Sequence, residues 1–159
     1  MSETLHINEG SKNDKYETLL QQIPALISGE TDPLAIASNL VAALKQTFDF
    51  FWVGMYRVKQ DELVLGPFQG PIACTRIARG KGVCGKAWVT LETQVVPNVH
   101  EWEGHIACSS LTNSEIVVPL FYQGEVIGVL DIDSTAFNTF DEVDAFYLKS
   151  IGEWFVPLD

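Results

Sequence analysis

The stretch EIVVPLFYQGEVIGVLDID occupies residues 115–133 and consists of two apolar, β-branched runs on either side of Gln123-Gly124. Two such runs joined by a short polar turn with glycine predict a β-hairpin. Side chains alternate between the two faces of a strand, so the second run places Asp131 and Asp133 on the same face. The hairpin therefore predicts a sheet that carries a pair of carboxylates at the end of one strand.

More strands are predicted before this hairpin. Short aromatic and β-branched runs at 50–58 and 62–68 flank the polar turn 59–61, and a short strand follows at 94–96. Apolar residues at helical spacing predict four helices. They are a helix from Tyr16 to Ile27 that bends or ends near Pro24, a second over 32–48, a short one over 83–89, and a last one that opens with a Thr139/Glu142 capping-box pattern and runs to Trp154 with Phe146 on its apolar face.

Consecutive hairpins indicate an antiparallel sheet, because parallel strands need long crossover connections. With the helices packed mainly on one side of that sheet, the expected fold is a single α+β domain rather than a doubly wound parallel sheet. The length of 159 residues suits one domain. We expect residues 1–13 to form a flexible tail and residues 14–159 to form the domain.

The charge balance limits the classes of partner. Ten Lys and Arg against 21 Asp and Glu give a net charge of −11. Such a charge repels phosphate backbones and anionic lipid, so neither nucleic acid nor a membrane surface is an expected partner. The polar N-terminal stretch has no secretion signal, and no apolar run is long enough to span a membrane. These features predict a cytoplasmic protein, and they leave open whether it forms a homodimer.

The two carboxylates at the end of the hairpin suggest chemistry. Close acids repel each other, so the proton affinity of one member rises unless a cation lies between them. Such a pair prepares an acid catalyst or a site for an ammonium group or a metal. The alternative is a strand end that reaches solvent, with both acids hydrated.

Three cysteines are too few for a disulfide framework, so each is considered by position. Cys84 lies at the start of a predicted helix, where free amides and Lys86 favour a thiolate. Cys108 lies in the segment 98–113, whose length without periodicity is typical of functional loops. These two are candidates for a nucleophile and its resolving partner, although buried cysteines are often inert.

Two further constellations are considered. Cys74, Cys84, Cys108 and His105 could supply four zinc ligands, but His105 and Cys108 form the only close pair, which disfavours structural zinc. Trp52 and Tyr56 share a strand face and could wall a pocket for a cation or a methyl group; alternatively, they belong to the core.

Five motifs, taken together, resemble those of the free methionine-R-sulfoxide reductases, which are GAF-domain enzymes. They are GVCGKAW at 82–88, PNVH at 97–100, GHIAC at 104–108, NSEIVVP at 113–119 and GVLDIDS at 128–134. The resemblance covers most of the chain and includes all three cysteines. It implies a GAF-like fold and a thiol-dependent reductase of free L-methionine-(R)-sulfoxide, without metal or organic cofactor.

The resemblance also implies roles for individual residues. Cys108 is the nucleophile that becomes a sulfenic acid, Cys84 is the principal resolving thiol, which closes a Cys84–Cys108 disulfide, and Cys74 is an auxiliary thiol. Thioredoxin is the implied reductant. Trp52 matches the residue that holds the substrate methyl group.

The carboxylates Glu115, Asp131 and Asp133 match groups that contact the substrate near its sulfoxide oxygen and amino group. A protonated carboxyl can donate to the sulfoxide oxygen, while an ionised one pairs with the ammonium that a peptide-bound methionine lacks. Two rival functions remain open at this point: a non-catalytic GAF module that senses a small molecule, and a zinc-stabilised interaction domain.

Overall fold

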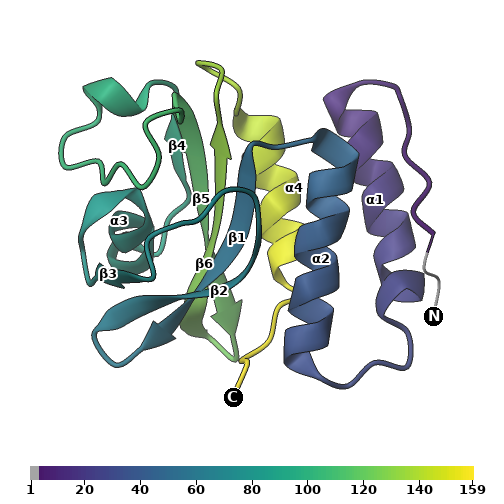
Figure 1. Cartoon of the computed structure of the whole chain (residues 1–159). Coiled ribbons are helices and arrows are strands. Elements are labelled where there is room, and N and C mark those ends of the chain that lie inside the picture. Colours follow the sequence, from purple (N-terminus) through teal and green to yellow (C-terminus); the bar gives the residue numbers. More distant parts are fainter. Residues whose placement is uncertain (1–3) are drawn as a thin grey trace.

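Within residues 4–159, which the computed structural model describes, six antiparallel strands form one sheet in the order β3-β2-β1-β6-β5-β4 (Figure 1). The elements in chain order are α1 (Lys12–Ile27), α2 (Pro33–Phe48), β1 (Trp52–Lys59), β2 (Glu62–Gln69), β3 (Arg76–Ala78), α3 (Gly82–Thr90), β4 (Gln94–Val96), η1 (Val99–Glu101), β5 (Ser114–Tyr122), β6 (Glu125–Ser134) and α4 (Glu142–Gly152). The predicted α+β fold with an antiparallel sheet is confirmed.

The sheet separates two apolar cores. On one face, β6 contributes Leu130 and Ile132 to the core that α1, α2 and α4 cover. On the opposite face, Val129 joins a second core under α3. Three helices thus lie on one side of the sheet, as expected, and α3 packs with long connecting segments on the other. The second face is therefore the one on which loops can enclose a site.

Helix α1 does not end at Pro24, contrary to one of the two outcomes expected there. It continues to Ile27, because Tyr16, Leu19 and Ile23 are buried against the core and only the last turn follows the proline. The Pro24 side chain is exposed. Tertiary packing therefore outweighs the local cost of proline near a helix end.

The start of α1 lies two residues before the expected domain boundary. Ser11 caps the helix through the Asp14 backbone N–H, and the Asp14 side chain accepts from the Ser11 N–H. The predicted tail, residues 1–13, falls partly outside the described residues. Of its described part, Leu5 packs against the core and the His6 backbone N–H donates to Gln22 Oε1 at 2.7 Å.

Helix α4 begins with a different capping box from the predicted one. Asp141 is the N-cap and Asp144 is its reciprocal partner, whereas the Thr139 hydroxyl donates to Ser134 Oγ at 2.7 Å. Phe146, expected on the buried face, is 68% exposed, and Trp154 lies beyond the end of the helix. The tertiary hydrogen bond of the threonine removes it from the cap and shifts the start of the helix.

No helix within the described part of the chain combines the length and apolarity needed to cross a membrane.

Candidate active site

Three neighbouring strands bring the predicted carboxylates and aromatic residues onto the α3 side of the sheet. In the strand register, Asp133 of β6 lies opposite both Trp52 of β1 and Glu115 of β5. Asp131 lies two residues back on the same face, and Tyr56 joins the same apolar cluster as Trp52. The pleat of the strands therefore produces the shared face that the alternation predicted.

A cavity of about 40 Å³ opens on this face. Since one water molecule needs about 10–15 Å³ on this measure, the space holds roughly three waters. Its lining includes every predicted site residue except Cys74, and it adds residues that the sequence did not single out. The residues of the lining are Phe51, Trp52, Tyr56, Pro71, Ile72, Ala73, Ile77, Gly82, Val83, Cys84, His105, Ile106, Cys108, Ser109, Thr112, Glu115, Asp131 and Asp133.

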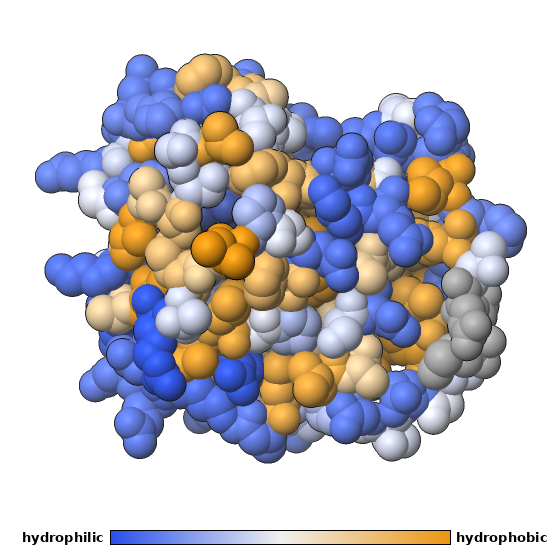
Figure 2. All heavy atoms as spheres, in the orientation of Figure 1, coloured by the Kyte–Doolittle hydropathy of each residue, from blue (hydrophilic) through white to orange (hydrophobic). Residues whose placement is uncertain are grey.

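Two segments without regular secondary structure, 70–75 and 102–113, complete the walls of the cavity. The first crosses the front of the molecule in Figure 1, and apolar side chains reach the surface on this side in Figure 2. Ile72, in that segment, is 91% exposed. The sequence offered little indication that these two segments would line the cavity, because neither segment has the periodic pattern of a helix or strand.

The carboxyl groups form a buried cluster rather than a hydrated strand end. Glu115 and Asp131 are each 6% exposed. Burial and the Asp133 charge raise the pKa of Glu115, burial and Glu115 raise that of Asp131, and burial and Asp131 raise that of Asp133, all well above their ordinary values. Desolvation and mutual repulsion both favour the neutral form. Each carboxyl group therefore keeps its proton to a higher pH than an exposed carboxyl does, and in that form it can donate a hydrogen bond.

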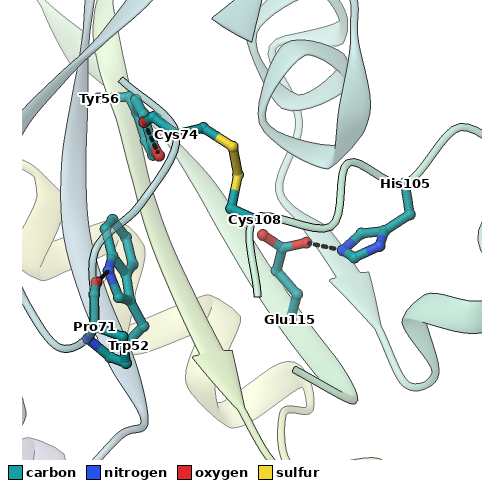
Figure 3. The surroundings of a disulfide bond; sticks show 7 residues. All are labelled: Trp52, Tyr56, Pro71, Cys74, His105, Cys108 and Glu115. Atoms are coloured by element: carbon teal, nitrogen blue, oxygen red, sulfur yellow. Dashed lines mark hydrogen bonds and ion pairs between the residues drawn. A yellow bond between two sulfur atoms is a disulfide. The ribbon is translucent and has the colours of Figure 1, made fainter. Parts of the chain in front are cut away.

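His105 lies beside this cluster and was not singled out as a partner of a carboxyl group. Its Nε2 is 3.6 Å from Glu115 Oε1 (Figure 3). Burial lowers the pKa of His105 while burial and Asp133 raise that of Glu115, so both shifts favour neutral groups. Since the lowered pKa keeps His105 neutral at pH 7, the contact is not an ion pair.

The aromatic wall is held by hydrogen bonds to segment 70–75. The Trp52 ring stacks on Phe68 at 5.4 Å and lies 6.0 Å from the Tyr56 ring, and its Nε1–H donates to the Pro71 carbonyl at 3.0 Å. The Tyr56 hydroxyl donates to the Cys74 carbonyl at 2.8 Å. These rings belong to the apolar cluster and at the same time line the cavity.

A disulfide joins Cys74 to Cys108 across 34 residues, with a Cα–Cα distance of 5.6 Å (Figure 3). The predicted Cys84–Cys108 disulfide is therefore wrong for this structure. Cys84 is a free thiol inside α3 and only 4% exposed, whereas Cys74 lies on the segment next to the loop that carries Cys108. Two flexible connections can meet more readily than a loop and a buried helix.

The expected thiolate at Cys84 is also wrong. Burial, followed by the charge of Asp131, raises the pKa of this thiol well above its ordinary value. Lys86 Nζ, which the sequence placed near this thiol, lies over the Trp102 ring, 5.4 Å from its centroid. In this environment the cost of desolvation exceeds the stabilisation that a helix N-terminus gives to a thiolate.

The zinc set considered from the sequence is not assembled, since two of its sulfurs are bonded to each other. The structure instead brings together Cys84, Glu115 and Asp131, whose ligand-type atoms all lie within 4.8 Å of one another. The alternative interpretation, a zinc-stabilised domain, therefore lacks the free ligands that it requires from Cys74, Cys84, Cys108 and His105.

The profile of the GAF domain family matches residues 30–153, so this antiparallel sheet with its site on the α3 face is that of a GAF domain. Similar proteins indicate which family within the GAF class the chain belongs to. A "GAF domain-containing protein A" of Dictyostelium discoideum is 57% identical over 95% of this chain and 96% of its own length. The "Free methionine-R-sulfoxide reductase" of Escherichia coli strain K12 is 46% identical over 89% of this chain and 86% of its own.

Solved structures agree with this assignment. The free methionine-R-sulfoxide reductase of Neisseria meningitidis, described in complex with its substrate, is 50% identical and superposes with a TM-score of 0.94 over 97% of this chain and 93% of its own. The chain belongs to the free methionine-R-sulfoxide reductases, a family of GAF-fold oxidoreductases.

Proposed function

We propose that this protein reduces free L-methionine-(R)-sulfoxide to L-methionine, with Cys108 as the nucleophile. The observation that carries the proposal is the placement of Cys108 on the wall of a cavity that also exposes three carboxyl groups favoured in the protonated state. Thiolate attack at a sulfoxide sulfur needs a proton donor at the sulfoxide oxygen, because that oxygen is a poor leaving group. The carboxyl cluster supplies such donors.

The reaction balances in two steps. The Cys108 thiolate attacks the sulfoxide sulfur, and a carboxyl group protonates the sulfoxide oxygen. The hydroxyl is then transferred to the Cys108 sulfur as the S–O and S–S bonds to the substrate sulfur break, so methionine leaves and Cys108 becomes a sulfenic acid. The Cys74 thiol then attacks the Cys108 sulfur, the S–O bond breaks and water leaves. The product is the Cys74–Cys108 disulfide that the structure contains. Two thiols are oxidised as one sulfoxide is reduced.

The cluster also accounts for the choice of a free amino acid. A carboxylate of Glu115, Asp131 or Asp133 that ionises on substrate binding pairs with the substrate ammonium, which is absent from a methionine inside a peptide. A site that is built for this charge leaves a buried carboxyl without a partner when a peptide-bound methionine enters. The Trp52 and Tyr56 rings contribute the apolar wall for the methyl group.

The size of the cavity indicates the order of events. Space for roughly three waters is less than an amino acid sulfoxide needs, so we infer that substrate binds after the disulfide has been reduced. Reduction of Cys74–Cys108 frees the two loops that the bond ties together. Substrate then binds to the reduced form only.

We propose thioredoxin as the reductant. Cys108 is exposed and Cys74 is half-buried, so the disulfide is accessible to the thiolate of another protein. A disulfide that must be reduced in every cycle suits a reducing compartment, which supports a cytoplasmic location.

The test is a comparison of turnover rates on four substrates, namely free and peptide-bound methionine as the R and the S sulfoxide, with thioredoxin as recycling agent. The proposal predicts turnover on the free R form and little on the other three. Equal rates on free and peptide-bound substrate would show that the carboxyl cluster does not select the substrate by its ammonium group. Binding of one sulfoxide per chain without any turnover would favour the sensing module.

A further inference from the structure

Three buried side chains from three elements converge on the floor of the cavity. Cys84 comes from α3, Glu115 from β5 and Asp131 from β6, and their ligand-type atoms lie within 4.8 Å of one another. Ligands of a single zinc ion lie about 3–4 Å apart, since each is ~2.0–2.3 Å from the metal. Small side-chain rotations therefore bring all three atoms to one ion.

A second observation points to a cation at the same place. Asp131 Oδ1 and Asp133 Oδ1 are buried and have no hydrogen-bond partner among the described residues. A buried acceptor without a partner costs free energy, which a bound cation recovers. Both residues line the cavity, whose volume of about 40 Å³ suits a metal ion with a coordinated water. The disulfide-bonded form thus has space for an ion.

We propose that the disulfide-bonded form of this protein binds one divalent ion of the zinc class through Cys84 Sγ and the carboxylates of Glu115 and Asp131. One sulfur and two oxygen donors suit Zn²⁺ and Co²⁺, whereas Mg²⁺ and Ca²⁺ require oxygen ligands. A fourth position remains for water, as in zinc sites that are not closed by protein ligands. Binding releases the protons that the thiol and the carboxyl groups hold.

The ion would occupy carboxyl groups that the proposed reaction uses. Zn²⁺ therefore competes with the sulfoxide in the reduced enzyme, and this consequence rests on the proposed function. Metal binding to the disulfide-bonded form does not depend on it. A measurement on the oxidised protein consequently separates a failure of the metal site from a failure of the reductase assignment.

The experiment is a titration of the oxidised, full-length chain with Co²⁺, monitored by absorption. Cys74 and Cys108 are bonded, so Cys84 is the remaining thiol of the three cysteines. We expect about one Co²⁺ per chain and a thiolate-to-cobalt charge-transfer band that Zn²⁺ abolishes on displacement. Cys84→Ser should lose the band, and Asp131→Asn should weaken binding at least about tenfold, a loss seen even for outer partners of metal sites.

Glu92→Gln, which alters an exposed carboxylate outside the cavity, is the matched control and should bind like the unmodified chain. Near-ultraviolet circular dichroism verifies that each variant is folded. Absence of the charge-transfer band in the unmodified chain would overturn the proposal whatever the variants do. Equal affinity in Asp131→Asn and the unmodified chain would also overturn it, because the thiol would then bind without the carboxylate.

Discussion

Cys74 and Cys84 differ in their surroundings, and this difference predicts different kinetic roles. Cys74 is half-buried and already bonded to Cys108, while Cys84 is enclosed beside Asp131. In Cys74→Ser, the first turnover should still release about one methionine per chain, but thioredoxin-dependent turnover should fall at least about tenfold because the sulfenic acid lacks its partner. Cys84→Ser should still release methionine in the first turnover and should then be recycled by thioredoxin.

Rapid-quench kinetics measure the burst, and the oxidation of NADPH through thioredoxin reductase measures the recycling rate. The account is contradicted if Cys84→Ser loses recycling while Cys74→Ser keeps it. That result would restore the pairing that the sequence resemblance implied.

The buried carboxyl groups should reduce stability as pH rises. In the folded chain the pKa of Asp131 is raised, whereas in the unfolded chain it is ordinary, at about 4. Between these two values the native state binds the extra proton, so the free energy of unfolding falls with increasing pH. Asp131→Asn removes this penalty and should raise the free energy of unfolding at pH 8 by about 1 kcal/mol or more, while it impairs turnover.

Urea denaturation of both proteins between pH 5 and 8 tests this prediction, with Glu92→Gln as the exposed control. A parallel pH dependence in Asp131→Asn and the unmodified chain would show that the carboxyl cluster is not the source of the pH dependence.

The sequence allowed Asp131 and Asp133 to be placed together, because the alternation of side chains along β6 is a local property. Their protonation state and the partner of Cys108 depend on burial by distant segments, which one sequence does not reveal.

At the scale of the elements, the absence of a side chain at Gly54 of β1 makes room for the Trp52 ring. A Cβ at this position would overlap Trp52 Cη2 and lie 2.6 Å from Phe68 Cβ. Gly54→Ala should therefore displace the indole and raise KM several-fold, by about 1 kcal/mol of binding free energy. The value of kcat should change less, because the sulfur and the carboxyl groups remain in place.

Steady-state kinetics and tryptophan fluorescence measure this effect. Gly29→Ala is the control: Gly29 has φ +80° and a Cβ there would have no other atom within 4 Å, so its substitution strains the backbone away from the site. If both variants change KM equally, general destabilisation rather than the indole position is responsible.

The elements that the sequence predicted well are those with local signals. The hairpin at 115–133 has a clear turn between two periodic runs, and its strands form as expected. Errors occurred where a tertiary contact competed with a local preference: Thr139 bonds to Ser134 instead of capping α4, and packing carries α1 past Pro24. The pairing of β1 with β6, which brings Trp52 to Asp133, joins segments distant in sequence and has no local signal.

At the scale of the whole molecule, a buried polar network joins the first and last helices. Asp144 is 1% exposed and accepts from the Tyr16 hydroxyl at 2.6 Å and from Lys12 Nζ at 2.6 Å. In Tyr16→Phe, Oδ1 of Asp144 loses the hydrogen bond from the tyrosine hydroxyl. The free energy of unfolding should therefore fall by about 1–3 kcal/mol. The rate of the folded enzyme should not change, because the network lies on the helical side of the sheet, away from the cavity.

Urea denaturation and turnover at a temperature well below unfolding test both parts of this prediction. Tyr122→Phe, at an exposed position of β5, is the matched control and should leave stability nearly unchanged. Equal losses in the two variants would mean that the hydrogen bond to Asp144 does not stabilise the association of α1 with α4.

The fate of the three sulfurs after one turnover tests the central claim most directly. The reduced chain is mixed with one equivalent of free L-methionine-(R)-sulfoxide, quenched in acid and alkylated, and its peptides are mapped by mass spectrometry. The account predicts one methionine released, a Cys74–Cys108 linked peptide and alkylated Cys84. Methionine release with Cys108 recovered as an alkylated thiol would contradict it.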